Sequence, residues 1–464
     1  TTRYPETLDR LVKCNFAVDS LGVTSAARVN AMDAKAMALM EKTTRPLATG
    51  RWETGLLWRH PDAILPDDRQ CALKRLQSLE RKLAADTNLT AAYTDKMAQL
   101  VAKGYARRLS PDEASLPAPL KWYLPHFAVT NPNKPGKIRV VFDAASRCRG
   151  TSLNDQLLTG PDLLSSLLGN ILRFRESSIA IAADIQEMFL RIQIRKEDQP
   201  SQLYLWRSPN KREPETYQLA SMMFGATCSP SSAQYVRDRV AGQYEDQYPA
   251  AAAAIRSRFY MDDYLDAVES PDDAAALVRD VSGCSETERV LGLLWDPSTD
   301  RFIYTFLEAV SPEEATRPTE RQLLSIVMKI FDPVGFVACL TTRSKILLQA
   351  VWRSTVGRDD LITPEHAERW RDWMSLLQGS SISIPRQSLQ RKTSGVTLHL
   401  FCDASEQACC AVAYFVEDVQ GILQATFIAS KCKVAPLKPL SIPRLELQSA
   451  LMADRLARTI RLES

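Results

Sequence analysis

The sequence predicts an α+β protein of several domains, from three observations. The chain has 464 residues and a mass of 51.9 kDa, which is too long for one hydrophobic core. Residues 67–109 carry apolar side chains at three- to four-residue spacing amid dense charge, a pattern typical of helices. From residue 116 onward, short apolar stretches of strand composition are interspersed with helical ones. We therefore expect two to four domains of mixed helix and strand.

Composition excludes several classes of protein. Apolar residues make up 45% and charged residues 24% of the chain, which is typical of a globular protein and argues against a disordered one. The densest apolar run, Ala250–Ile255, is far shorter than a membrane span of roughly 18 residues. No basic-then-apolar leader follows Thr1, so we expect no signal peptide. The ten cysteines never form a C-x-x-C pair, which favours reduced thiols of an intracellular protein over a disulfide or zinc framework.

The charge is unevenly distributed along the chain. The net charge of +3 divides into +8 over residues 1–180 and −5 over residues 181–464. This division predicts a surface that binds a polyanion next to a carboxylate site for metal. On charge alone, an ordinary fluctuation among solvated side chains is the simpler explanation.

Local patterns then predict the order of the elements. Prolines between Pro111 and Pro119 suggest a boundary, and a second change of composition comes near residue 394. The further expected elements are strands at 122–129 and 137–143 joined by a turn at 131–136, a strand at 178–184 followed by a helix from Ile185, a tight hairpin at 259–266, helices over 319–353 interrupted at 332–335, and a strand at 396–403 with partners at 408–415 and 425–430.

Three aspartates lie at the ends of these predicted strands. Asp184 ends one apolar strand, and Asp262 with Asp263 occupies the tip of the predicted hairpin. Carboxylates brought together repel one another unless divalent cations neutralise them, and hard oxygen ligands select Mg²⁺. Two such ions held roughly 3.5–4 Å apart would support an in-line phosphoryl transfer. Without the surrounding motifs, a solvated strand end or turn residue is the simpler explanation of each aspartate, since Asp favours turns.

The surrounding motifs resemble those of reverse transcriptases, most closely those of BEL/Pao-type LTR retrotransposons. They follow in order as Gly50–Trp58, Trp122–Val129, Arg139–Asp143, Ser152–Asn154 with Gly160–Pro161, Ala183–Phe189, Phe224–Pro230, Phe259–Asp263, Val290–Pro297, Phe331–Gly335 and Lys345–Gln349. The resemblance implies a right-hand polymerase of fingers, palm and thumb. It implies an N-terminal helical arm over 1–115, fingers and palm over 116–300, a helical thumb or connection over 301–393, and a partial RNase H-like α/β domain over 394–464.

The resemblance also implies an activity, RNA-directed DNA synthesis by two-metal transfer from a dNTP to a primer 3′-OH. Asp184 and Asp262 would ligate Mg²⁺, or Mn²⁺ in its place, with Asp263 supporting the site. The implied nucleotide-binding and primer-binding residues are Lys137 and Arg139 on the triphosphate, Phe189 under the sugar, Phe224 and Gly225 at the nucleotide pocket, and Leu291 and Gly292 on the primer. A bulky ring at Phe189 would exclude a ribose 2′-OH.

The last seventy residues resemble the start of a ribonuclease H domain. Asp403 and Glu446 match its first two metal-binding acids. Two acids do not complete that site, so we expect no RNase activity from this chain alone.

The implied partners are an RNA template, a DNA primer, dNTPs and the gag, protease and integrase parts of a polyprotein, with no membrane. The implied location is a cytoplasmic particle or the nucleus. The stretch 280–290 is shorter than in relatives, which supports an alternative, a catalytically inactive or domesticated remnant that still binds nucleic acid.

Overall fold

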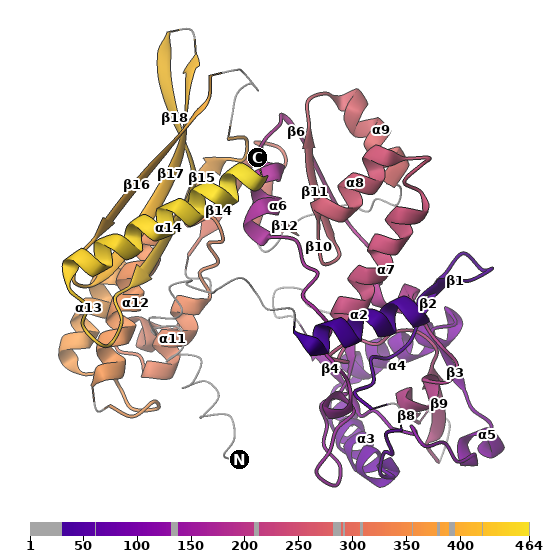
Figure 1. Cartoon of the computed structure of the whole chain (residues 1–464). Helices are drawn as coiled ribbons and strands as arrows, with labels where there is room; N and C mark the ends of the chain where they lie inside the picture. The colour runs from indigo at the N-terminus through magenta and orange to yellow at the C-terminus, as the bar shows by residue number, and fades with distance from the viewer. Residues whose placement is uncertain are drawn as a thin grey trace. The chain divides into compact units, whose positions relative to one another are not determined.

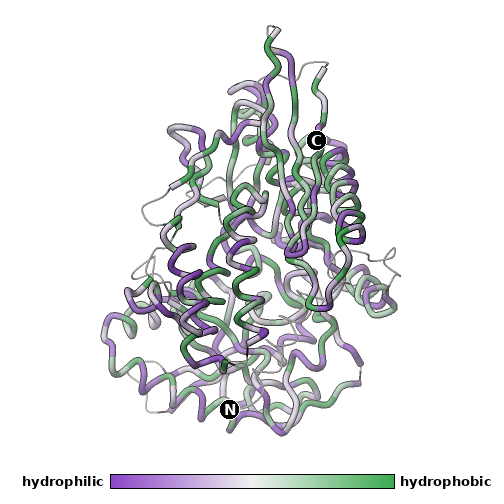
Figure 2. Tube along the Cα trace, turned by 90° about the vertical axis from the view of Figure 1, so that its left-hand side faces the viewer, coloured by the Kyte–Doolittle hydropathy of each residue, from purple (hydrophilic) through white to green (hydrophobic). Residues whose placement is uncertain are grey.

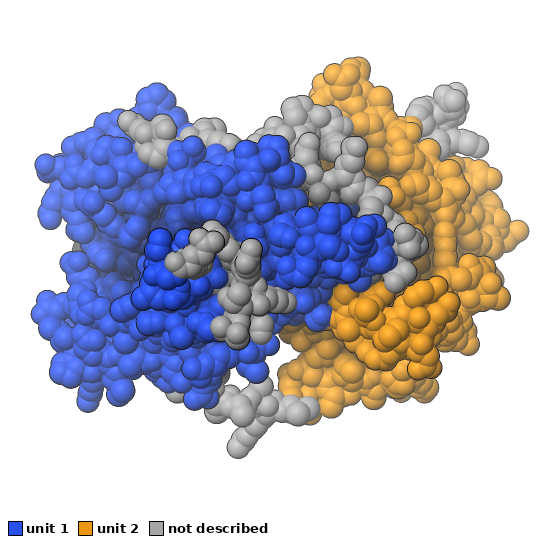
Figure 3. Space-filling model, turned by 90° about the horizontal axis from the view of Figure 1, so that it is seen from above, with its two compact units in different colours: residues 1–26, 165–184, 257–464 blue, residues 27–164, 185–256 orange. Residues whose placement is uncertain are grey.

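The computed structural model describes most of the chain and divides it into two compact units (Figure 3). The described residues are 30–60, 62–130, 138–207, 213–281, 289–290, 293–306, 310–354, 356–377, 381–388, 395–419 and 421–463. Among them, unit 1 holds residues 165–184 and those from 257 onward. Unit 2 holds the described residues up to 164 together with 185–256.

Unit 2 combines helices with three small sheets (Figure 1). The sheets have the orders β1-β2-β7, β3-β9-β8 and β4-β5. Its helices are α2 (Ala31–Thr43), α3 (Arg69–Ala84), α4 (Thr87–Ala102), α5 (Pro111–Ser115), α7 (Ser229–Gln243) and α8 (Pro249–Arg258), the last running on into unit 1. Its strands are β1 (Arg45–Pro46), β2 (Trp52–Thr54), β3 (Ala106–Arg108), β4 (His126–Thr130), β5 (Ile138–Phe142), β7 (Gln193–Ile194), β8 (Leu203–Trp206) and β9 (Glu215–Leu219).

Unit 1 contains three further sheets and the C-terminal helices. The sheets have the orders β10-β11-β6, β12-β13-β14-β15 and β16-β17-β18. The strands are β6 (Ile179–Asp184), β10 (Phe259–Tyr260), β11 (Asp263–Val268), β12 (Arg289–Val290), β13 (Leu293–Asp296), β14 (Arg301–Thr305), β15 (Ser381–Pro385), β16 (Thr397–Ala404), β17 (Ala408–Val419) and β18 (Ile422–Val434). The helices are α6 (Leu167–Phe174), α9 (Pro271–Val281), α10 (Pro312–Thr316), α11 (Glu320–Met328), α12 (Ala338–Arg353), α13 (Pro364–Ser375) and α14 (Ile442–Glu463).

Apolar spacing explains how the last helix packs. Leu445, Met452, Leu456 and Ile460 recur at three- to four-residue intervals and are buried, so α14 presents one apolar stripe. The stripe packs on β16 and β17 through Ala411, Ala413 and neighbouring residues. Figure 2 shows the resulting alternation of hydrophilic and hydrophobic residues along the helix that ends at the C label.

Most of the predicted elements are confirmed. The hairpin β4-β5, the strand β6, the hairpin β10-β11 and the three strands β16-β17-β18 lie where the sequence predicts them. The predicted helices over 319–353 are α11 and α12, with turns between them at 332–335. The α+β fold class is confirmed.

Two predictions are wrong. The helix expected from Ile185 is a turn followed by one short 3-10 helix, Phe189–Arg191. Glu187 has a positive φ of 56° there, which an α-helix does not allow. Its carboxylate accepts hydrogen bonds from Lys103 and Tyr105, and these bonds stabilise the turn. The expectation of reduced thiols alone is also wrong, because Cys71 and Cys148 form a disulfide across 77 residues of unit 2.

Among the described residues, no helix combines the length and the apolar character that crossing a bilayer requires.

Candidate active site

A tight hairpin in unit 1 displays the paired aspartates. Tyr260 of β10 and Asp263 of β11 are antiparallel partners, so Met261 and Asp262 form a two-residue turn between them. Met261 has a φ of 58°, an unfavourable conformation for a residue with a side chain. Such strained positions persist where the surrounding structure enforces them, and they occur often at functional sites.

The neighbouring strand places the third aspartate beside this hairpin. Asp184 is the last residue of β6, and its direct antiparallel partner is Asp263. Asp184 is exposed, whereas Asp262 and Asp263 are half-buried. One end of the sheet β10-β11-β6 therefore carries all three predicted carboxylates.

The electrostatics of this sheet end suit a divalent cation. Burial, followed by the charges of Asp262 and Asp184, raises the pKa of Asp263 to about 6. Carboxylates that disfavour one another's ionisation are the donor set that Mg²⁺ stabilises. In the part of the chain that the structure describes, no three His, Cys, Asp or Glu side chains have the arrangement needed to hold a metal ion. The three aspartates thus have the oxygen donors that Mg²⁺ prefers and occupy adjacent positions on neighbouring strands. Their side chains, however, do not converge on a common point.

Side chains beneath the hairpin fix its position. Ser165 donates to the carbonyl of Phe259 at 2.6 Å, and Leu265 is buried in a core with Ile171 and Phe174. Asp266 is buried on β11, where its carboxylate accepts from the Tyr264 hydroxyl at 2.8 Å. The sequence did not predict Asp266 as a site residue, because acidic residues also occur at the alternating, solvent-facing positions of an ordinary strand.

A buried arginine anchors the start of β6 and was also missed. Arg386 is fully buried and pairs with Asp300 through Nε and Nη2, at 2.6 and 2.9 Å. Its Nη2 also donates to the carbonyls of Ser177 and Ser178, at 2.9 and 3.1 Å, and its Nη1 donates to that of Phe174. The strand that ends in Asp184 is thereby held at its beginning by one guanidinium group.

The predicted nucleotide pocket residues of unit 2 also come together. The rings of Phe189 and Phe224 lie edge to face with centroids 4.5 Å apart. Phe189 is 7% exposed and Phe224 is 45% exposed, so one ring of the pair is buried and the other is accessible to solvent. The open ring face offers an apolar surface of the kind on which a flat ligand or a sugar packs.

A glycine brings the Phe224 turn close to β5. Gly225 has a φ of +118°, and a Cβ on it would lie 2.2 Å from the carbonyl oxygen of Phe142. Asn154 holds the same turn from the other side, because its amide donates to the Gly225 carbonyl at 3.0 Å and accepts from the Thr227 N–H at 2.9 Å. In the sequence, Asn154 ends the motif Ser152–Asn154, and the motif alone predicts no role for it.

The remaining predicted ligands of nucleotide and primer are only partly described. Arg139 is exposed on β5, where it is the antiparallel partner of Val129. Lys137, Leu291 and Gly292 lie outside the described residues, so their predicted roles stay predictions.

The two RNase H-like acids lie at one end of the sheet β16-β17-β18. Asp403 is exposed on β16, and Glu446 is half-buried in the first turns of α14. Ser449, one helical turn after Glu446, donates to the carbonyl of Asp403 at 2.8 Å. The helix and the strand are thus in contact at the point where both acids occur.

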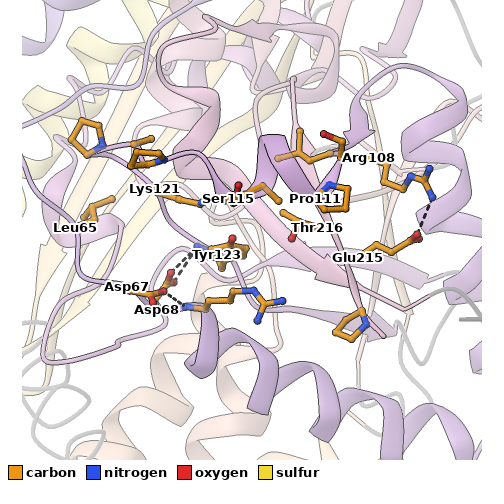
Figure 4. A pocket seen from close by; sticks show the side chains of 18 residues that line it. Leu65, Asp67, Asp68, Arg108, Pro111, Ser115, Lys121, Tyr123, Glu215 and Thr216 are labelled. Carbon is orange, nitrogen blue, oxygen red and sulfur yellow. Dashed lines mark hydrogen bonds and ion pairs between the residues drawn. The ribbon is translucent and has the colours of Figure 1, made fainter. Parts of the chain in front are cut away.

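A separate cavity of about 1100 Å³ lies in unit 2 and contains none of the predicted site residues. Figure 4 shows Arg108 bonded to Glu215 and Asp68 bonded to the backbone N–H of Tyr123. Burial, the largest cause, raises the pKa of Asp68 to about 7, although its carboxylate accepts from the Tyr123 N–H at 3.0 Å. Since these groups already bond one another, we assign the cavity no ligand.

Comparison with known proteins identifies two stretches of the chain. Residues 134–290 match the family "Reverse transcriptase (RNA-dependent DNA polymerase)", and residues 319–464 match the family "Pao retrotransposon-like RNaseH-like domain". Comparison with curated proteins gives no match. Among solved structures, the foamy viral protease-reverse transcriptase in complex with double-stranded DNA is similar, with a TM-score of 0.49 and 16% sequence identity over 78% of this chain.

The chain spans 59% of the length of that viral protein. The two family matches confirm the resemblance that the motifs indicated. The three aspartates of the candidate site, Asp184, Asp262 and Asp263, all lie within the matched residues 134–290. The chain therefore carries one stretch, residues 134–290, that is similar to the reverse transcriptase (RNA-dependent DNA polymerase) family, and a second, residues 319–464, that is similar to the Pao retrotransposon-like RNaseH-like family.

Proposed function

We propose that the chain copies RNA into DNA by adding deoxynucleotides to a primer 3′-OH. The observation that carries this proposal is the ladder register in which Asp184 faces Asp263, directly beside Asp262 in the turn. Three carboxylates at one sheet end, within the stretch that matches the reverse transcriptase family, support a nucleotidyl-transfer site.

In the proposed reaction the primer 3′-oxygen attacks the α-phosphorus of the dNTP. A new P–O bond forms, the bond between the α-phosphorus and the α,β-bridging oxygen breaks, pyrophosphate leaves with that oxygen, and the proton of the 3′-OH passes to solvent. Asp184 and Asp262 would hold two Mg²⁺ or Mn²⁺ ions with Asp263 in support, and the bound ions would neutralise the charge that develops on the phosphate oxygens. The supporting observation is that burial and neighbouring charge raise the pKa of Asp263 when no cation is bound.

The residues of unit 2 would bind and select the nucleotide. Arg139, with Lys137, would contact the triphosphate, and the Phe189 and Phe224 pair would contact the sugar and base. The covered ring of Phe189 is the group that would reject a 2′-OH, because it cannot move away without losing its packing on Phe224. Leu291 and Gly292 would contact the primer.

We propose that the domain divisions at 1–115, 116–300, 301–393 and 394–464 describe functional parts, namely arm, fingers with palm, thumb or connection, and partial RNase H-like domain. Asp403 and Glu446 would supply two acids to a ribonuclease H-type metal site. The proposed partners are an RNA template, a DNA primer, dNTPs and the other parts of a retrotransposon polyprotein. The proposed location is intracellular, in a particle or in the nucleus.

A second candidate function is nucleic-acid binding without catalysis. One observation favours it: the described carboxylates do not converge into a three-ligand group. Such a protein would bind a template–primer duplex with ordinary salt dependence and would not extend the primer.

Primer extension with metal removal separates the two candidates. The purified chain is incubated with a labelled DNA primer on an RNA template and four dNTPs, first with EDTA, then with excess Mg²⁺ or Mn²⁺. Polymerase function predicts no extension with EDTA and extension after metal is restored. Duplex binding without extension at any metal concentration would contradict the polymerase and support the second candidate.

A further inference from the structure

A second polar cavity in unit 1 is lined by four cationic side chains. Its volume is about 560 Å³. Lys345 comes from α12, Lys431 and Lys433 from β18, and Arg455 from α14. Lys431 and Lys433 are two residues apart on one strand and therefore point to the same face. Three separate elements thus bring positive charge to one space.

The cavity has little negative charge to balance these cations. Asp332 is the one acid among its lining residues. Both oxygens of Asp332 already accept hydrogen bonds, from the N–H groups of Phe336 and Val337 at 2.8 Å each. Its carboxylate holds the turn before α12, and its charge also interacts with Lys345, so one acid faces four cations among the lining residues.

The cations also disfavour one another. Lys433 is half-buried, and burial followed by the charge of Lys431 lowers the pKa of its ammonium group, with a smaller contribution from Arg455. Repulsion of this kind is relieved when an anion enters between the cations.

The start of a helix adds to the positive field. Ser166, Leu167 and Leu168 line the cavity at the first turn of α6, and the Ser166 hydroxyl accepts from the Gly169 N–H at 3.1 Å. A helix N-terminus carries partial positive charge and favours phosphate groups. This feature reinforces the site that the four side chains define.

We propose that this cavity is a phosphate-binding site of unit 1. The ligand chemistry is a run of phosphate groups, supplied either by the backbone of a template–primer duplex or by a free polyphosphate. The duplex form of the proposal rests on the proposed function, since it assigns the site to the nucleic acid being copied. Lysine ammonium groups would bind as point charges, without reading base sequence.

The test compares a Lys431→Gln/Lys433→Gln double variant with wild type and with Lys438→Gln as a matched control. Lys438 is exposed in the loop after β18 and does not line the cavity. Lys345→Gln serves as a second variant from another element, so that a local defect of β18 is not decisive. Circular dichroism melting shows that each chain is folded.

Binding of a labelled RNA–DNA duplex is measured by fluorescence anisotropy at several salt concentrations, with duplexes of increasing length behind the primer terminus. We expect the slope of log affinity against log salt to fall by roughly 1 per lysine removed, for the longer duplexes. Sodium tripolyphosphate is titrated separately by calorimetry. If the variants lower only the salt dependence of duplex binding, the ligand of the cavity is the nucleic-acid backbone. If they lose tripolyphosphate binding, the ligand is a free polyphosphate.

Unchanged duplex binding and unchanged tripolyphosphate binding in both folded cavity variants would overturn the inference. Failure of the proposed function gives a different result. In that case wild type binds duplex with a slope that the cavity variants reduce, and it extends no primer at any Mg²⁺ concentration.

Discussion

Asp184 is the direct antiparallel partner of Asp263, at the end of the sheet where the two-residue turn displays Asp262. Two strands separated by more than seventy residues thus bring like charges together. Folding gains nothing from this juxtaposition alone, because neighbouring carboxylates repel one another. The proximity is explained if the site binds divalent cations, and it is the basis of the predictions that concern catalysis.

Substitution of Gly225 tests the close approach of the Phe224 turn to β5. We expect Gly225→Ala to lower the free energy of unfolding by on the order of 2 kcal/mol or more, since the new methyl group meets the Phe142 carbonyl oxygen at 2.2 Å. Gly150→Ala is the matched control, because Gly150 also has a positive φ and has open space around it. Urea unfolding measures both. Equal losses in the two variants would show that the close contact is unimportant.

Truncation of Phe189 tests the proposed sugar discrimination. We expect Phe189→Ala to raise the incorporation of ribonucleotides relative to deoxynucleotides roughly tenfold or more, since the ring that would exclude the 2′-OH is gone. Phe127→Ala, an exposed ring of β4, is the control. Single-nucleotide incorporation with matched dNTP and rNTP gives the ratio of kcat/KM values. An unchanged ratio would remove Phe189 from this role.

His126 predicts a pH dependence of stability. It is buried among aromatic rings, its Nε2–H donates to the Leu205 carbonyl at 2.9 Å, and its Nδ1 accepts from the Tyr93 hydroxyl at 2.6 Å. Burial lowers its pKa to about 4, below the ordinary value of 6.5. The stabilisation is therefore complete above pH 6.5 and is lost as pH falls toward 4, by at most about 3 kcal/mol.

Urea unfolding of wild type and His126→Gln at pH 8 and at pH 4.5 checks this prediction. The variant is expected to lose less stability than wild type over the same interval, because it has no imidazole to protonate. Parallel losses in both chains would assign the acid sensitivity to other groups.

Removal of Arg386 tests the anchor of β6. We expect Arg386→Met to lower the stability of unit 1 by about 3–5 kcal/mol, because three backbone carbonyls lose this donor and Asp300 loses its cationic partner, keeping the bond from Trp295. Arg301→Met is the control, as the Arg301 side chain is half-buried and bonds only Ser383 among the contacts the structure describes. We expect that change to cost about 1 kcal/mol or less. If Arg386→Met lowers the free energy of unfolding as little as Arg301→Met does, then β6 keeps its position without this arginine.

Local sequence pattern predicted the elements that depend on short-range spacing. The hairpin at Phe259–Asp266 follows from strand residues on both sides of an acidic pair, and the strand at 179–184 follows from an apolar run. Features that depend on distant partners were not predictable in this way. The turn at Glu187 depends on Lys103 and Tyr105, and the Cys71–Cys148 disulfide joins residues 77 positions apart.

The candidate site shows the same division. Asp184, Asp262 and Asp263 could be predicted because each ends or begins a strand and because the motifs around them resemble a known family. Arg386 and Asn154 could not, since no spacing in the sequence connects Arg386 with Ser177, or Asn154 with Thr227. Their functions lie in hydrogen bonds to backbone atoms of other segments, which carry no local sequence signal.

The most direct test of the central claim is single-turnover primer extension by wild type beside Asp262→Ala, with Asp272→Ala as the control. Asp272 is an exposed acid at the start of α9, outside the proposed site. We predict that Asp262→Ala lowers the rate of nucleotide addition by on the order of 10³ or more while duplex binding and folding persist. Asp272→Ala should extend primers as wild type does. Extension by folded Asp262→Ala at the wild-type rate would contradict the assignment of the strand-end carboxylates as the polymerase site.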